Sequence, residues 1–318
     1  MPVRLLTAPE TNAIPAMHMR SSENLRAYWR ALVNLLVGGN LLSLSLWRDP
    51  RRMVGYAGEC WFLLKTYADR RRVCQKNVFE VIASEGAPSS LDVKFVPHPM
   101  GQGAWFGAVP SYTVDIVSLC LLCSLLKPKV VFEVGTLDGY TSLHLAMNAG
   151  PEAHVYTLDL PMEGAKTHLR NTWVDMRHIE QHERIRKYLF DGRPEMDNIT
   201  CLFSDSATFD YQPYLGRVDL FFIDGAHSYE YVRSDTLNAL RCCHTGSVIA
   251  WHDFGRTGVN GVSKWLVEFS RDHRVYSVPG GSLAFMVVES APNENAGSDP
   301  RDRPEHAPST EEAPAASA

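Results

Sequence analysis

The sequence has neither an excess of basic residues nor a framework of cysteines. Its 318 residues include 31 Lys and Arg against 36 Asp and Glu, a net charge of −5. Nucleic acid held through phosphate contacts requires a basic surface, so no such partner is expected. Seven cysteines in this length do not indicate a disulfide scaffold, and we expect a cytoplasmic protein. Cys120 and Cys123 form a CxxC inside the apolar run LCLLCSLL and are expected to be buried small hydrophobes.

A long uninterrupted apolar run is also lacking. The first twenty residues have no continuous apolar core of the kind found in a signal peptide. Residues 23–47 are rich in apolar side chains, but Arg30, Asn34 and the pair Gly38 and Gly39 interrupt them, whereas a transmembrane helix needs about 20 consecutive apolar residues. We expect two short helices here that pack on the core or on a partner chain, as in a homodimer. A peripheral membrane contact is the alternative.

What the sequence does contain is a strand followed by a glycine turn and a helix. Residues 130–134, VVFEV, form a β-branched and aromatic run that indicates a strand buried on both faces. The strand ends at Gly135, and apolar residues recur at helical spacing from about Gly139. A turn of this kind presents free backbone N–H groups and the positive end of a helix, which suits a polar or anionic ligand.

Strands and helices then alternate, which predicts an α/β fold with a doubly wound, mostly parallel sheet of seven strands. The expected strands are 130–134, 154–160, 199–205, 218–224, 246–253, 273–278 and 282–289. The last two flank Pro279-Gly280-Gly281 and are expected to form an antiparallel hairpin. The charged segment 164–188 is expected to be a helical insertion whose His178 and His182 face solvent, as does His144 on the first helix.

Three parts are expected along the chain. Residues 1–110 form an N-terminal helical and loop region, with a helix at 61–82 and a long covering loop at 86–110. Residues 111–289 form the ligand-binding domain, which opens with an amphipathic helix over 111–126 that Pro128 ends. Residues 290–318 contain Pro, Ala, Glu and Asp but no aromatic residue, so this tail is expected to be disordered.

Acidic residues stand at the ends of five consecutive strands. In open α/β sheets, ligands bind beyond the carboxyl ends of the strands, so these side chains are expected to surround one site. A helix cap is the alternative for any single one of them, such as Asp205. The strand-end residues are Glu133, Asp159, Asp205 with Ser206, Asp224, and His252 with Asp253.

The glycine turn resembles a known motif. A dinucleotide fingerprint would place glycine where Leu137 and Tyr140 stand. Instead, E-V-G-T-L-D-G-Y-T-S resembles the first motif of the class I S-adenosylmethionine (SAM) methyltransferases. It is most similar to small-molecule O-methyltransferases of the catechol and caffeoyl-CoA type and to the bacterial class I family with I-D-G-x-H-S-Y and H-D motifs. The resemblance runs from Val130 to about Glu289, half of the chain.

This resemblance implies SAM as cofactor and assigns residues to its binding. The turn and the helix start would hold the methionine part, Asp159 the ribose hydroxyls, and Asp205 with Ser206 the adenine edge. The implied cofactor-binding residues are Glu133, Gly135, Thr136, Gly139, Thr141, Ser142, Asp159, Asp205, Ser206 and Asp224.

The segment F-F-I-D-G-A-H-S-Y and the H-D pair carry the implied chemistry. In the catechol-type enzymes an aspartate at the position of Asp224 binds Mg²⁺, so Asp224, His252 and Asp253 are candidate ligands for Mg²⁺ or another divalent cation. A metal-free site, in which the histidine orients Asp253, is the alternative. His227 occupies the position of a lysine base in those relatives and is the candidate general base, with Asp224 and Asp253 as the other catalytic residues. Its alternative role is to cap the helix that follows.

The sequence therefore predicts methyl transfer from SAM to a hydroxyl of a small molecule. Two alternatives remain: a metal-dependent hydroxylase or oxidoreductase on the same fold, and a non-catalytic SAM-binding partner protein. Residues 1–110 and 164–188 are expected to form the acceptor pocket.

Overall fold

The computed structural model describes residues 73–83, 90–98, 110–183, 185, 187–256 and 258–289. The expectations for the rest of residues 1–110 and for the tail 290–318 lie outside the described residues. These include the apolar segment 23–47. Within the described part of the chain, no helix is both long enough and apolar enough to cross a lipid bilayer.

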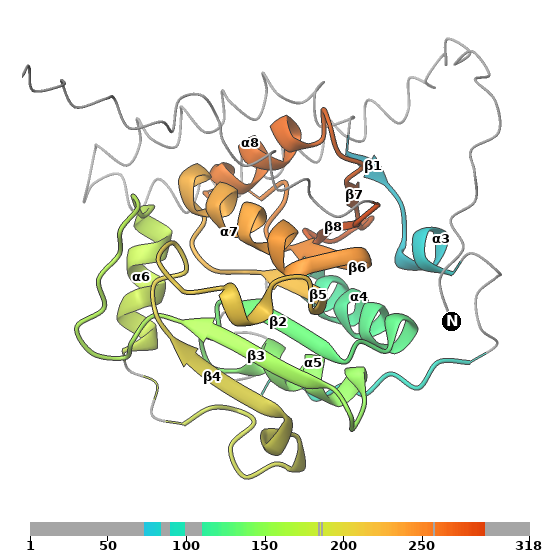
Figure 1. Cartoon of the computed structure of the whole chain (residues 1–318), viewed down its shortest axis with the longest axis horizontal. Helices are drawn as coiled ribbons and strands as arrows, with labels where there is room; N and C mark the ends of the chain where they lie inside the picture. The colour runs from blue at the N-terminus through green and yellow to red at the C-terminus, as the bar shows by residue number, and fades with distance from the viewer. Residues whose placement is uncertain are drawn as a thin grey trace, which may run out of the picture.

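A sheet of eight strands, mostly parallel, forms the centre of the molecule (Figure 1). In space the strands follow the order β1-β7-β8-β6-β5-β2-β3-β4, and β8 runs antiparallel to both of its neighbours. The α/β class and the C-terminal hairpin are as predicted, whereas the short edge strand β1 was missed. The strands are β1 (Cys74–Gln75), β2 (Val130–Val134), β3 (His154–Asp159), β4 (Ile199–Phe203), β5 (Val218–Ile223), β6 (Cys243–Trp251), β7 (Tyr276–Ser277) and β8 (Ala284–Val287).

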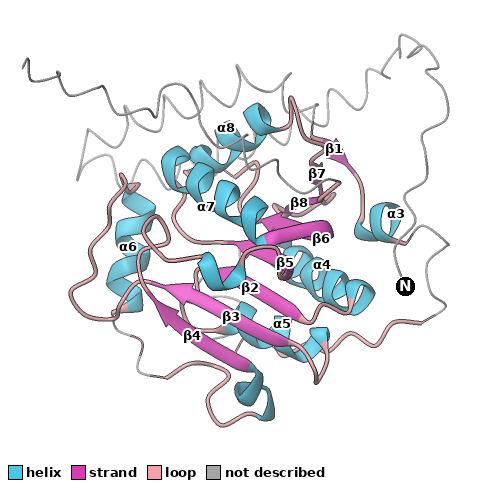
Figure 2. Ribbon diagram, in the orientation of Figure 1, coloured by secondary structure: helices cyan, strands magenta, loops and turns pink. Residues whose placement is uncertain are grey.

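Helices cover both faces of this sheet (Figure 2). Because side chains alternate along a strand, Phe132 and Val134 of β2 pack with α7 and α8, while Val131 packs with α4 and α5. Each face therefore has its own apolar layer. The α-helices are α3 (Val78–Ile82), α4 (Pro110–Leu126), α5 (Tyr140–Ala149), α6 (Trp173–His182), α7 (Tyr229–Cys242) and α8 (Asn260–Phe269), with 3₁₀ turns at Pro194–Asn198 and Gln212–Tyr214.

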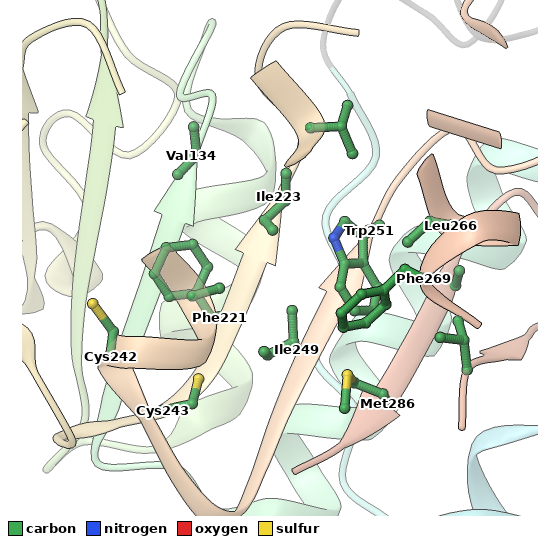
Figure 3. Packing of buried hydrophobic residues seen from close by; sticks show 14 of the residues in the cluster. Val134, Phe221, Ile223, Cys242, Cys243, Ile249, Trp251, Leu266, Phe269 and Met286 are labelled. Carbon is green, nitrogen blue, oxygen red and sulfur yellow. The ribbon is translucent and has the colours of Figure 1, made fainter. Parts of the chain in front are cut away.

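The layer under α7 and α8 surrounds Trp251, which is fully buried at the end of β6 (Figure 3). The indole N–H groups of Trp251 and Trp265 both donate to Oγ1 of Thr236, each over 2.9 Å. Thr236 in turn donates to the carbonyl of Val232. These bonds satisfy the polar atoms of two large aromatic side chains, which would otherwise be costly to bury.

Three predicted helices differ from the structure. Helix α4 ends at Leu126 as predicted, but its side chains are buried or half-buried on every side from Val114 onward, so it is not amphipathic. The predicted helix over 61–82 is confirmed only over α3 in its described part, because β1 and the residues around it precede that helix. The insertion 164–188 is helical only over α6.

Residues 90–98 form no helix or strand and lie against α4 and α5, as expected for a covering loop. The backbone of Lys94 accepts from and donates to the side-chain amide of Asn148. His144 Nε2 accepts from the N–H of Val96, and its Nδ1–H donates to the carbonyl of Tyr140. The prediction that His144 faces solvent is therefore wrong, because this loop buries it.

Candidate active site

The turn after β2 requires glycine at its first position. Gly135 has φ = +101°, and a Cβ atom built there would lie 2.2 Å from the backbone oxygen of Asp224. Its N–H donates to the carbonyl of Leu158 over 2.8 Å. The ends of β2, β3 and β5 thus meet at this residue, and no side chain fits between them. The next two N–H groups of the turn, those of Thr136 and Leu137, are also bonded within the protein, so the free N–H groups expected from the sequence are not found at these residues.

Two residues predicted to bind the cofactor instead support the turn from below. Glu133 is fully buried, and its Oε2 accepts hydrogen bonds from the hydroxyls of Ser142 and Thr157. Burial raises the pKa of Glu133 to about 8, although these two hydroxyl bonds oppose the shift. Neither Glu133 nor Ser142 borders the cavity described below. Their role here is structural.

Gly139 also lies away from the cavity. A Cβ atom at this residue would lie 2.5 Å from the ring of Phe190, so the absence of a side chain lets the loop containing Phe190 pack on the start of α5. Gly139 therefore shapes the turn, and the cavity is lined by its neighbours Asp138 and Tyr140.

Asp159, at the end of β3, closes the turn from the other side. Its Oδ2 accepts from the N–H groups of Thr136 and Leu137 over 2.9 and 2.8 Å. His182 Nδ1 lies 3.6 Å from the same oxygen, and its Nε2 contacts the carbonyl of Leu160. The prediction that His182 faces solvent is wrong, because α6 folds back over the end of β3.

A cavity of about 1240 Å³ opens at the carboxyl ends of the strands. It extends from the Gly135 turn, past β3 and β4, to the ends of β5 and β6, and α6 forms one wall. The predicted site residues that line it are Gly135, Thr136, Thr141, Asp159, Asp205, Ser206, Asp224, His227, His252 and Asp253. Ten of the positions chosen from the sequence therefore converge on one space. His178 lines this cavity too and does not face solvent as predicted.

Asp205 is held by protein groups on both oxygens. Oδ2 accepts from the N–H and Nδ1 of His168 and from the hydroxyl of Tyr231, and Oδ1 accepts from the N–H of Ala207. Burial opposes the charge of Asp205, but these hydrogen bonds outweigh it and lower its pKa. The carboxylate thus organises the loop after β4, in line with the capping alternative.

Asp224 belongs to a line of three side chains that leads into the protein. Its Oδ1 accepts from Nδ1 of His252 over 3.1 Å, and Nε2 of His252 lies 3.2 Å from Oδ2 of Asp115. Asp115, on α4, also accepts from the N–H and hydroxyl of Ser282 and from the N–H of Leu283. Although burial disfavours its charge, Asp224 and Asp253 raise the pKa of His252 well above its ordinary value. His252 is thereby fixed between carboxylates.

His227 lies between two further carboxylates. Nδ1 is 2.6 Å from Oδ1 of Asp175, and Nε2 is 2.9 Å from Oδ2 of Asp253. Burial disfavours its charge, but the hydrogen bonds to Asp175 and Asp253 outweigh this and raise its pKa to about 10. The side chain of Ser228, not that of His227, caps α7 by accepting from the N–H of Tyr231. A raised pKa favours the protonated imidazole near neutral pH, whereas a general base must be unprotonated, so the geometry does not support that role for His227 and it stays a prediction.

Asp253 has its backbone in the left-handed region, with φ = +64°. Such a conformation is unfavourable for a residue with a side chain and is often found at functional sites. Its Oδ1 accepts from Nη1 of Arg256 over 2.6 Å and lies 3.2 Å from Nδ1 of His252. Burial works against its charge, but these cationic neighbours lower the pKa of Asp253 far below its usual range.

The candidate metal ligands were tested against this geometry. Among the described residues, Asp224, His227 and Asp253 each offer an atom within 4.8 Å of the others, so the spacing alone permits an ion. The set differs from the predicted one in that His227 takes the place of His252. However, both oxygens of Asp253 are bonded to cationic side chains, and both nitrogens of His227 face carboxylates. The donor set as arranged does not fit a divalent cation, because the ion would lie close to the guanidinium of Arg256 and would have to displace the contacts of His227 with carboxylates.

The sequence analysis missed three residues of this site. Asp115 was detectable in principle, because it is the one acid in the otherwise apolar helix α4. Asp175 lies in a segment where charged residues are frequent, so nothing distinguishes it. Arg256 follows the H-D pair by three residues, a spacing that a tight turn brings together.

Comparison with known proteins identifies one matching family model. Residues 132–254 match the family model described as a methyltransferase domain. The matched segment begins in β2 and ends after Asp253, so it includes the glycine turn and the ends of β3 to β6. This part of the chain is therefore similar to methyltransferase domains.

The individual relatives share less than a third of their aligned residues with this chain. Catechol O-methyltransferase of Mycobacterium tuberculosis (strain ATCC 25618 / H37Rv) is 27% identical over 142 residues, which cover 44% of this chain and 54% of the relative. The chain thus spans about half the length of this curated relative. Among solved structures, the O-methyltransferase TomG from Streptomyces achromogenes in complex with SAM is 18% identical, with a TM-score of 0.39. The match covers 59% of this chain and 87% of the TomG chain. An O-methyltransferase from Bacillus cereus in complex with SAH is 18% identical, with a TM-score of 0.36 and coverages of 57% and 85%.

Proposed function

We propose that this chain transfers a methyl group from SAM to a hydroxyl oxygen of a small molecule. The observation that carries the proposal is the single cavity that joins the Gly135 turn and Asp159 to the acidic cluster at the ends of β5 and β6. Its volume of about 1240 Å³ accommodates a nucleoside-sized cofactor together with a small acceptor.

The cofactor is assigned to the part of the cavity around the turn. The backbone of Gly135 and Thr136 and the hydroxyl of Thr141 would face the methionine part. Asp159 borders the cavity at the end of β3, where a carboxylate can accept from ribose hydroxyls. Because its Oδ2 already holds two amides of the turn, the same carboxylate would fix the turn and bind the ribose. The loop of Asp205 and Ser206 would border the adenine.

The acceptor is assigned to the space between α6 and the acidic cluster. Transfer of a methyl group from a sulfonium to an oxygen requires alignment of donor and acceptor and removal of the hydroxyl proton. Asp224 lines the cavity and is the carboxylate that would accept the proton of the acceptor hydroxyl as the bond from sulfur to the methyl group breaks and the bond from oxygen forms. His252 and Asp115 hold Asp224 in position, and His227 with Arg256 holds Asp253. These residues orient the reacting oxygen and balance charge around it.

The hydroxylase alternative gains no support from the geometry. It requires open coordination positions, and both oxygens of Asp253 are bonded to His227 and Arg256. We therefore retain methyl transfer to a small molecule as the proposed reaction.

Calorimetric titration with SAM and with NAD tests the cofactor. The parent protein should bind SAM and not NAD, because Leu137 and Tyr140 stand where a dinucleotide turn has glycine. Asp159→Ala should weaken SAM binding by about 1.5–3 kcal/mol, the usual value of hydrogen bonds to a charged group. Asp272→Ala, at an exposed carboxylate, is the matched control.

A melting curve for each variant separates loss of the ligand contact from loss of the turn. Unchanged SAM affinity in a folded Asp159→Ala protein would contradict the assignment of Asp159. An acceptor screen that monitors formation of S-adenosylhomocysteine then tests methyl transfer itself. Binding of SAM without turnover on any hydroxyl acceptor would favour the non-catalytic alternative.

A further inference from the structure

Asp253 is the centre of a network of positive side chains. Arg256 Nη1 lies 2.6 Å from its Oδ1, and His227 Nε2 lies 2.9 Å from its Oδ2. His252 Nδ1 lies 3.2 Å from Oδ1 as well. Three cationic or proton-donating groups thus surround one buried carboxylate, where the sequence led us to expect a metal ion.

The contact with Arg256 is built into the backbone. The N–H of Arg256 bonds to the carbonyl of Asp253 over 3.3 Å, and Asp253 has a positive φ, so a tight turn brings the two side chains together. The N–H of Phe254 bonds to the carbonyl of Ser282, which fixes this turn on the β7–β8 connection. A guanidinium remains charged at any pH at which the protein is folded.

The two imidazoles are held by carboxylates on both sides. His227 lies between Asp175 and Asp253, and the two nitrogens of His252 face Asp115 on one side and Asp224 on the other. Each of these ring nitrogens is already within hydrogen-bond distance of a carboxylate oxygen, so an ion could bind to one of them only by displacing that contact. Four carboxylates therefore face three cationic groups of the protein itself.

A divalent cation is excluded by this arrangement. To bind Asp224 and Asp253 it would have to displace the guanidinium of Arg256 or lie close to it, and like charges in a buried site repel strongly. It would also have to break at least one buried hydrogen bond to His227 or His252.

We propose that this active site works without a divalent cation, and that Arg256, His227 and His252 occupy the place of the metal around Asp253. The statement about catalysis rests on the proposed methyltransferase function. The statement that the site binds no divalent cation does not depend on that function. The acceptor oxygen is then positioned by Asp224, and the positive charge near it comes from side chains.

Titration of the purified full-length protein with Mn²⁺, followed by the loss of the free-ion electron paramagnetic resonance signal, tests the metal-binding part. The parent should bind no stoichiometric Mn²⁺. One equivalent bound by the parent and lost in Asp253→Asn would overturn the proposal. This measurement needs no active enzyme, so it gives an answer even if the proposed function fails.

Variants of Arg256 test the blocking charge. Arg256→Gln should increase Mn²⁺ affinity by about 100-fold or more, because a buried like charge is removed. Arg256→Lys keeps the charge and should remain unable to bind Mn²⁺. Arg271→Gln, at an exposed arginine, should behave as the parent does. A folded Arg256→Gln protein that still binds no Mn²⁺ would overturn the role of Arg256.

With an active acceptor in hand, the rate of methyl transfer should be the same before and after treatment with a chelator. A rate abolished by the chelator and restored by Mg²⁺ or Mn²⁺ would overturn the proposal. An inactive protein that also binds no Mn²⁺ would count against the proposed function alone.

Discussion

Burial of the Glu133 carboxyl beneath the glycine turn makes the stability of the protein depend on pH. It is fully buried, its pKa is raised to about 8, and one of its oxygens, Oε1, has no hydrogen-bond partner. In the unfolded chain the pKa is near 4.5. Its contribution to stability is therefore fully present below pH 4.5 and is lost as the pH rises to about 8, since the folded state then holds a proton that the unfolded chain has released.

Glu133→Gln should remove this dependence. Between about pH 5 and pH 8, the free energy of unfolding of the parent should fall with pH by about 1.4 kcal/mol per unit more than that of the variant. Urea unfolding at several pH values measures the difference. Glu152→Gln, at an exposed carboxyl, should leave the slope unchanged. Equal slopes for the parent and Glu133→Gln would show that Glu133 ionises normally.

Gly135 is the residue where the backbone allows no substitution. Gly135→Ala should destabilise the protein by about 2–5 kcal/mol, because alanine is strained at φ = +101° and its Cβ atom meets the backbone of Asp224. Gly150→Ala shares the positive φ but has no atom within 4 Å of the added Cβ, so it should cost less. Thermal melting compares the two. A smaller loss for Gly135→Ala would contradict the close approach.

At the residue scale, sequence reasoning placed the strand-end side chains but not their orientation. Asp159, Asp224 and Asp253 follow buried strands, so their convergence at one edge of the sheet was predictable. Glu133 is the last residue but one of β2, and the alternation of side chains along the strand directs it into the protein interior. The role of His227 depends on Asp175, which no sequence spacing relates to it.

Among the elements, α6 contributes a site residue, Asp175, that was not predicted. Thr172 and Asp175 cap its start reciprocally: the N–H of Thr172 bonds to Asp175 Oδ2, and the N–H of Asp175 bonds to Thr172 Oγ1. The other oxygen of Asp175 accepts from the N–H of His227 and lies 2.6 Å from its Nδ1. One side chain thus both begins the helix and attaches it to the active site.

Asp175→Ala should therefore destabilise the protein by about 3–5 kcal/mol, the cost of leaving a buried charge without its partner. It should also lower the pKa of His227, since one of the two carboxylates that raise it is lost. Unfolding in urea and NMR titration of the imidazole measure the two effects. Glu180→Gln, exposed on the same helix, is the control. An unchanged His227 pKa in the folded variant would show that Asp175 of α6 does not influence the active site.

The strands were more predictable than the helices because their signal is local. Runs such as VVFEV and VDLFFI are apolar at all but one position, so the predicted element type is right and the boundaries agree within about two residues. Helix α4 and the insertion depend on what covers them, and residues 90–98 bury one side of α4 and α5. A hydrophobic pattern in one segment does not contain that information.

For the whole molecule, the sequence predicted the class of fold but not the eighth strand of the sheet. Alternation of strands and helices led to a parallel sheet, and the resemblance to methyltransferases added the antiparallel strand near one edge. The pairing of Cys74 and Gln75 with Tyr276 and Ser277 joins segments about 200 residues apart, and the two-residue strand β1 is too short to show a pattern.

The contact between Asp115 and the Ser282–Leu283 backbone determines when the active site is completed during synthesis. These partners are separated by 167 and 168 residues, so the contact cannot form until nearly all of the described chain has left the ribosome. The glycine turn, Asp159 and Asp205 are synthesised much earlier and can assemble around β2, β3 and β4. Asp115, which faces His252 from inside, is not held by the backbone of Ser282 and Leu283 until these last residues are in place. A nascent chain that stops before residue 282 would therefore carry the surfaces assigned to the cofactor while lacking a fixed acceptor side, and late, long-range closure of this kind slows folding.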